Sequence, residues 1–130
     1  MKQWVVATAA VLAWTAGQGA AADYDGSKLL ICANMEAADC GAGQACTKAR
    51  PDDLGAPAFI RIDFGRKMIV GPKRTTPIVS LEKSANQLLL QGIEMGYAWS
   101  LALDTSNGRL AATLVDRDGV IVLFGACTPL

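Results

Sequence analysis

Apolar and polar residues alternate along most of the chain after residue 55, and this period of two predicts strands and almost no helix. In the stretch AFIRIDF (58–64), Ile60, Ile62 and Phe64 fall on one face. Arg61 and Asp63 fall on the other face, as is typical of a half-buried strand. The same reasoning predicts further strands at 28–35, 67–70, 78–84, 87–94, 97–104, 109–116 and 120–127.

Short turn motifs separate the predicted strands. Asn107-Gly108, within TSNG, tolerates the positive φ angles of tight hairpin turns, and RDG at 117–119 is a second such motif. Consecutive hairpins build an antiparallel meander, and such a sheet avoids exposed edges best by curling into a barrel. The sequence therefore predicts an all-β fold, an antiparallel meander of about eight strands forming a small barrel, with an open β-sandwich as the alternative.

One segment departs from the alternating pattern. Residues 37–57 are rich in Gly, Ala, Asp and Pro. Because these residues favour turns and irregular structure, we expect a long loop here, with a helical turn over 45–49.

The N-terminus shows the three parts of a secretory signal. The charged Lys2 precedes an uncharged apolar run at 4–17, and alanines then supply the small residues that a signal peptidase reads. This run is shorter than the roughly 20 apolar residues of a membrane helix. Residues 1–22 are therefore expected to be a cleaved signal peptide. The mature chain, 23–130, is expected to be a single β-rich domain in the periplasm or secreted, with no membrane span after cleavage.

Composition restricts the chemistry. The chain contains no histidine, which removes His-based general bases, His-activated nucleophiles and the commonest metal ligand. It has 12 basic and 12 acidic residues, and the loss of Lys2 with the signal leaves a net charge of about −1. No basic face favours nucleic acid. Lys67, Lys73 and Arg74 surround Gly71-Pro72, and we expect them to form a solvated turn in preference to a docking loop.

The four cysteines predict disulfide bonds, because an exported chain with an even cysteine count is most simply a disulfide protein. Four cysteines allow three pairings. Cys32 and Cys127 lie in the first and last predicted strands, which barrel closure would bring together. Cys40 and Cys46 flank a short Gly-rich loop that can bend back on itself. We therefore expect the pairs Cys32–Cys127 and Cys40–Cys46.

The spacing of the cysteines argues against a metal or redox site. The pattern is Cys-x7-Cys-x5-Cys with a distant fourth cysteine. A four-thiolate zinc site shows two close pairs, and a redox pair usually reads Cys-x-x-Cys. We expect neither a bound metal nor a cofactor.

The stretch QGIEMGYAW (91–99) is the polar and aromatic segment that best suits ligand binding. Glu94, Tyr97 and Trp99 fall where they could line the mouth of a barrel. The alternative interpretation places Glu94 at a hairpin end and packs both aromatic rings into the core. No catalytic residue is predicted, because the carboxylates that could serve a glycosidase-like pair lie in different strands. They are Asp63, Glu82, Glu94, Asp104 and Asp116.

The C-terminal half carries the motifs TTPI (75–78), LLLQG (88–92), WS (99–100), NGRL (107–110) and FGACT (124–128). On these motifs, residues 75–128 resemble a group of small uncharacterised exported proteins of proteobacteria. The resemblance implies export and a β-rich domain, and it implies no activity.

These features predict an exported, non-enzymatic binding protein of unknown ligand. A protein-interaction module, such as an inhibitor of a cell-wall or proteolytic enzyme, is the alternative, and a carboxylate-based hydrolase is the least favoured. The interior should discriminate between the first two. Small side chains that face inward, together with a pocket of several hundred Å³, would favour a small ligand. A filled core with an exposed, ordered loop between Cys40 and Cys46 would favour a protein partner.

Overall fold

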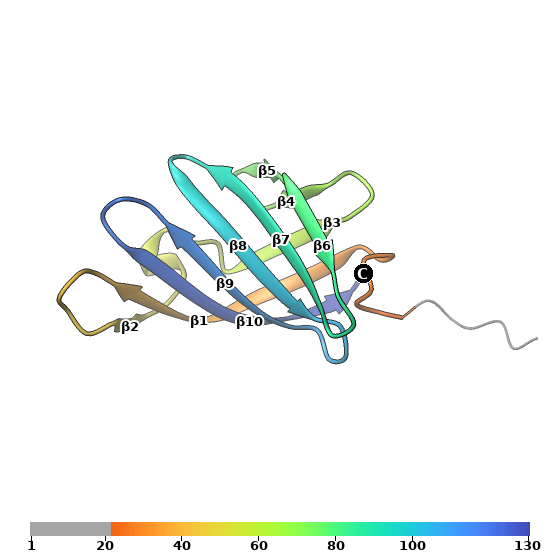
Figure 1. Cartoon of the computed structure of the whole chain (residues 1–130), viewed down its shortest axis with the longest axis horizontal. Helices are drawn as coiled ribbons and strands as arrows, with labels where there is room; N and C mark the ends of the chain where they lie inside the picture. Colours follow the sequence, from red (N-terminus) through yellow and green to blue (C-terminus); the bar gives the residue numbers. More distant parts are fainter. Residues whose placement is uncertain (1–21) are drawn as a thin grey trace, which may run out of the picture.

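The computed structural model describes residues 22–130, so the expected signal peptide lies outside the described residues, Ala22 excepted. The described chain is an all-β structure, as predicted (Figure 1). Its elements are β1 (Leu30–Cys40), β2 (Thr47–Ala49), a 3-10 helix (Asp52–Leu54), β3 (Phe59–Asp63), β4 (Met68–Val70), β5 (Thr75–Pro77), β6 (Ser80–Lys83), β7 (Gln87–Glu94), β8 (Tyr97–Asp104), β9 (Arg109–Val115) and β10 (Val120–Pro129). Among these residues no helix has the length and apolar character of a membrane span.

All the strands belong to one antiparallel sheet that is strongly curled into a half-barrel (Figure 1). The strand order is β5-β4-β3-β1-β10-β9-β8-β7-β6, with β2 paired to β1 beside β3. The edge strands β5 and β6 are consecutive in the chain, separated only by Ile78 and Val79. Ile78 N donates to Lys67 O (2.8 Å) and Val79 N donates to Gln91 O (2.9 Å). Two neighbouring residues therefore bond to opposite ends of the sheet.

The strand pattern departs from the prediction at this connection. A strand was expected over 78–84, but β6 begins at Ser80 and a separate short strand, β5, precedes it. The division follows from the hydrogen bonds, because 75–77 pairs with β4 whereas 80–83 pairs with β7. The described chain therefore has ten strands rather than about eight.

The first and last strands lie side by side as predicted, but in the middle of the sheet rather than at a closing seam, because β5 and β6 are the edge strands. β1 pairs with β10 along its whole length, and Cys32 stands directly opposite Cys127. A β-bulge at Met35 shifts the register between Asn34 and Glu36. On its other side β1 pairs first with β3 and then with β2.

The expected loop over 37–57 is partly wrong. Its first four residues continue β1, because β10 pairs with all four and β2 pairs with 37–39. This pairing outweighs the weak strand preference of Ala and Asp. Residues 47–49 form β2, so the helical turn expected over 45–49 is also wrong. The helical turn lies at Asp52–Leu54 instead and ends at Gly55, whose φ is 76°.

Apolar side chains fill the concave face of the half-barrel. The main cluster draws on seven of the strands and on residue 78, and consists of Leu30, Cys32, Ile60, Ile62, Ile69, Ile78, Leu88, Leu90, Trp99, Leu101, Leu103, Leu110 and Cys127. A smaller cluster of Ala37, Ala56 and Leu123 lies near the 3-10 helix, and the partly buried Leu54 packs against it. The core face predicted for 58–64 is confirmed, since Ile60 and Ile62 are both buried.

Candidate functional site

The predicted ligand-binding residues share the concave side at one end of the β7–β8 hairpin. Glu94 is paired with Tyr97, and the two-residue turn between them has positive φ angles at Met95 (47°) and Gly96 (84°). Positive φ at both central residues is typical of a type I′ hairpin turn, whose twist matches that of the two strands it joins. Side chains alternate along a strand, so Trp99 lies on the same side as Tyr97, two residues further in. The structure therefore brings the three predicted residues to one end of the half-barrel.

Trp99 is a core residue rather than a surface contact. It is 8 % exposed and belongs to the main apolar cluster. Its ring lies against Gly92, the residue opposite it on β7, where a Cβ would overlap the indole. Its Nε1 is buried and has no hydrogen-bond partner in the described structure. The interpretation that this ring packs into the core is the one the structure supports, and Tyr97 is half-buried at the rim.

Arg74 joins the candidate site from a different hairpin. It belongs to the β4–β5 turn, which is closed by Gly71 N donating to Arg74 O at 2.7 Å. Its Nε lies 3.1 Å from Oε1 of Glu94, and its Nη1 contacts Sδ of Met95. Thr76 Oγ1 also donates to Ile93 O at 3.3 Å. Side chains therefore connect β5 to the β7–β8 hairpin where the sheet leaves them unpaired.

A cavity of about 270 Å³ lies beside this connection. Its floor contains the buried side chains of Ile60 and Ile69, and one wall is the segment 55–58. Four charged residues also line it: Asp52, Lys73, Arg74 and Glu94. The cavity thus combines an apolar floor with carboxylates and cations, a composition suited to a small ligand that carries both charges.

We call this cavity the mouth cavity. Asn34 anchors its wall, the segment 55–58, to the sheet. Its Nδ2 donates to Pro57 O at 2.7 Å, and its backbone N donates to Ala58 O at 2.8 Å. Asn34 is only 7 % exposed, so these bonds form in a largely dry environment where they hold position well. The bulge next to Asn34 interrupts the regular ladder of β1 and coincides with the point where segment 55–58 is attached.

Three of the other four candidate carboxylates hold turns, and the fourth, Glu82, lies exposed on β6. Asp63 Oδ1 accepts from Arg66 N, Asp104 Oδ1 from Ser106 N and Oγ, and Asp116 Oδ1 from Asp118 N and Gly119 N. The hydrogen bonds of Ser106 hold the pKa of Asp104 below its ordinary value. Within residues 22–130 no group of three or more His, Cys, Asp or Glu side chains is placed to hold a metal ion.

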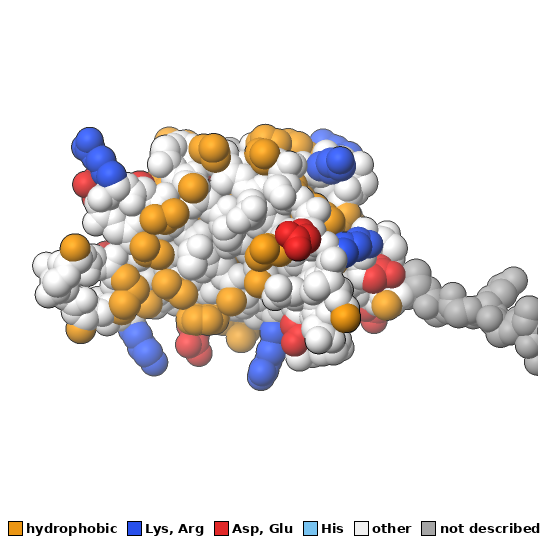
Figure 2. All heavy atoms as spheres, in the orientation of Figure 1, with side chains coloured by type: hydrophobic (Ala, Val, Ile, Leu, Met, Phe, Trp, Pro, Cys, Tyr) orange, Lys and Arg blue, Asp and Glu red, His pale blue; other side chains and the backbone are white. Residues whose placement is uncertain are grey.

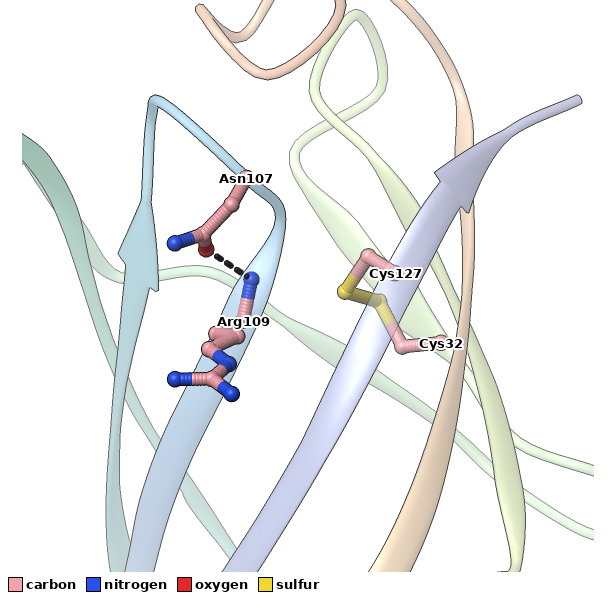
Figure 3. The surroundings of a disulfide bond; sticks show 4 residues. All are labelled: Cys32, Asn107, Arg109 and Cys127. Carbon is pink, nitrogen blue, oxygen red and sulfur yellow. Dashed lines mark hydrogen bonds between the residues drawn. A yellow bond between two sulfur atoms is a disulfide. The ribbon is translucent and has the colours of Figure 1, made fainter.

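Both expected disulfides are present. Cys32–Cys127 bridges β1 and β10 in the buried interior, beside the hairpin turn in which Asn107 Oδ1 accepts from Arg109 N (Figure 3). Cys40–Cys46 closes the loop between β1 and β2, in which every residue from 41 to 46 is exposed. The β1–β2 hairpin projects from one end of the half-barrel (Figure 1). Two disulfides are typical of proteins that fold outside the reducing cytoplasm.

Sequence reasoning missed Arg74 as a site residue. The cluster of Lys73 and Arg74 beside Gly71-Pro72 was visible in the sequence and was interpreted as a solvated turn. Only the curl of the sheet brings this turn to Glu94, 20 positions away along the chain. A wider hollow, of about 710 Å³, lies on the outer face of the sheet and contains none of the predicted ligand-binding residues.

Comparison of the chain with protein-family models, curated proteins and solved structures finds no match.

Proposed function

We propose that this protein is an exported, non-enzymatic binding protein, periplasmic or secreted, that holds a small ligand in the mouth cavity beside Arg74 and Glu94. One observation carries the proposal. Oppositely charged side chains from separate segments converge on a hollow with an apolar floor, next to the end of the β7–β8 hairpin. Small-molecule sites combine these features, an apolar lining and a few placed polar groups.

The lining defines the class of ligand. Lys73 and Arg74 suit a carboxylate, because a guanidinium and an ammonium both form charge-assisted hydrogen bonds with carboxylate oxygens. Glu94 and Asp52 suit an ammonium group by the same reasoning. Ile60 and Ile69 supply the apolar floor. The proposed ligand is therefore a small zwitterion with an apolar side chain, such as a free amino acid or a peptide terminus.

The test uses L-leucine as the probe. Calorimetry on the purified, oxidised protein should detect binding of L-leucine. It should detect about ten-fold weaker binding of leucinamide, which lacks the carboxylate, and of 4-methylpentanoate, which lacks the amine. Arg74→Gln should weaken L-leucine binding by about ten-fold, because a charged partner of the carboxylate is lost.

Arg117→Gln is the matched control, since the Arg117 side chain is 92 % exposed and does not line the mouth cavity. It should bind L-leucine as the unchanged protein does. Absence of binding to L-leucine and to the other apolar amino acids would overturn the proposal. Equal loss of affinity in the Arg74 and Arg117 variants would also overturn it.

A second candidate function, a protein-interaction module such as an inhibitor of a cell-wall or proteolytic enzyme, is supported by the β1–β2 loop. The interior is filled by the core, while the loop is exposed and is held by Cys40–Cys46 and by Gln44 N donating to Gly41 O at 3.3 Å. Pre-ordering a loop lowers the entropy lost on binding. Inhibition of a lysozyme or a serine protease that disappears in Cys40→Ser/Cys46→Ser would support this function, and no inhibition of either enzyme would contradict it.

A further inference from the structure

The outer face of the sheet has a floor of small side chains between bulkier ones. One cross-strand row runs through five strands, from β7 to β1, and shows the arrangement. It consists of Leu89, Ala102, Ala111, Phe124 and Glu36, each paired with the next. The next row repeats the small centre with Ser100 and Thr113. The floor therefore follows β8 and β9, with Leu89 on one side and Phe124 on the other.

This outer trough is hollowed, and apolar side chains line it together with the polar Ser84, Asn86 and Gln87. It has a volume of about 710 Å³, and its lining includes Met35, Ala102, Ala111 and Phe124. Met35 and Phe124 stand out at its side, with exposed fractions of 65 % and 49 %. Figure 2 shows apolar side chains gathered over β9 and β10, with most charged side chains toward the margins of this face. Exposed apolar surface of this kind is typical of a protein interface.

The trough also carries one unpaired charge of each sign. Glu36 and Arg109 both line it. Within the part of the chain that the structure describes, neither side chain forms an ion pair, since the ion pairs found there join other residues. The third charged residue of the lining, Asp104, is already bonded to Ser106. Glu36 and Arg109 are therefore available to a partner that presents the opposite charges.

We propose that the outer trough is the interface with a second copy of this chain. In a two-fold pairing, Phe124 and Met35 of each copy enter the Ala102–Ala111 floor of the other. Glu36 of each copy faces Arg109 of the other. A two-fold interface must be complementary to itself, and this face supplies both the protruding and the hollow part, and both signs of charge. A face that binds a protein of different sequence would need only a protruding or a hollow part, and only one sign of charge.

The first experiment measures self-association by sedimentation equilibrium of the purified, oxidised protein. The unchanged protein should show twice the mass of one chain, and Phe124→Asp should dimerise about thirty-fold more weakly, as expected for an anchor residue. Phe59→Asp is the matched control, because Phe59 is a 60 % exposed phenylalanine on β3, outside the trough. It should leave the dimer intact. A monomer at every concentration, or equal dissociation of both variants, would overturn the proposal.

The second experiment uses charge reversal to identify the partner as a second copy. Glu36→Lys alone and Arg109→Glu alone should each weaken the dimer by about ten-fold, because like charges then face each other. An equimolar mixture of the two single variants should dimerise as the unchanged protein does. In that pair the introduced lysine faces the introduced glutamate, and the unchanged arginine faces the unchanged glutamate. If the mixture stays monomeric, the proposed pairing of two copies is wrong.

Discussion

The two disulfide bonds begin on the same strand, only eight residues apart, and yet they lie in opposite environments. Cys32 and Cys127 are 0 % and 6 % exposed and stand opposite each other in the β1–β10 pair, joining positions 95 residues apart. Cys40 and Cys46 join positions six residues apart around an exposed loop. The first bridge joins β1 and β10, two neighbouring strands in the middle of the sheet, whereas the second shapes a projecting hairpin.

The two disulfides also differ in how closely the chain packs around them. Next to the buried bridge, Cys127 N donates to Gly108 O at 2.8 Å, so the β8–β9 turn is attached to β10 at the same point. Gly125, two residues away, packs directly on the backbone of Ala33 and Asn34. Around the exposed loop, a Cβ added at Gly41 would have no neighbour within 4 Å. The same covalent bond therefore stabilises a fold in one place and restricts a loop in the other.

Removal of the buried bridge should have the largest effect. The chain-entropy model assigns about 4.7 kcal/mol to a loop of this length, which is close to the whole stability of a small domain. Cys32→Ala/Cys127→Ala should therefore be largely unfolded in the absence of denaturant. Urea unfolding followed by the fluorescence of Trp99, the only tryptophan in residues 22–130, measures this. If removal of Cys32–Cys127 lowered the free energy of unfolding by no more than removal of Cys40–Cys46, the two bridges would not differ in their effect on stability.

Crowding at the buried bridge should have the next largest effect. In Gly125→Ala the new Cβ would overlap the carbonyl oxygen of Ala33 and would lie 3.0 Å from the carbonyl carbon of that residue. These backbone atoms cannot give way easily, because β1 is paired on both sides, so a loss of about 1–3 kcal/mol is expected. Gly41→Ala is the matched control in the exposed loop and should change stability by less than about 0.5 kcal/mol. Equal unfolding midpoints for the two variants would contradict the comparison.

Opening the exposed bridge should have a smaller effect that stays local. The chain-entropy model sets a ceiling of about 2.4 kcal/mol for a seven-residue loop. In Cys40→Ser/Cys46→Ser, amide exchange should increase over 41–49 while the amides of β7, β8 and β9 remain protected, because no core residue lies in the loop. Mild reductant should likewise open Cys40–Cys46 before Cys32–Cys127, as mass mapping of alkylated peptides would show. Reduction of the buried bridge first would contradict this order.

Local sequence patterns correctly predicted the buried face of the strand at 58–64 and the pairing of the cysteines. The period of two placed Ile60 and Ile62 in the core, and the positions of Cys32 and Cys127 in the first and last strands predicted their bridge. These features depend on alternation and on chain order, which the sequence displays directly.

The missed features depend on distant partners. Residues 37–40 are strand because β10 and β2 pair with them, although their composition favours a loop. The contact between Arg74 and Glu94 exists because the curled sheet brings two separate turns together. Neither effect leaves a periodic signal in the local sequence. Ligand binding by Glu94 and Tyr97 stays a prediction.

The smallest expected difference between the two regions is in how their stability depends on acid. We expect this acid-sensitive stability to come from Asp104, beside the buried bridge. Gly108 N donates to Asp104 O at 3.0 Å, so this residue starts the turn that is attached to Cys127. Because the hydrogen bonds of Ser106 lower the folded-state pKa of Asp104, its contribution to stability is present above the unfolded pKa of about 3.9. It is lost as the pH falls through the lowered folded pKa.

Asp104→Asn should therefore lose less stability than the unchanged protein on acidification from about pH 5 to pH 2, since asparagine accepts the same bonds without titrating. Ser106→Ala should also flatten the acid dependence, because it removes the side-chain hydrogen bond at 2.6 Å and keeps only the backbone bond at 2.8 Å. The difference should be small, because the carboxylate is open to solvent. Unfolding midpoints measured across this range for the three proteins test it. Curves that differ only by a constant offset would show that Asp104 adds no acid-sensitive stability to the region around the buried bridge.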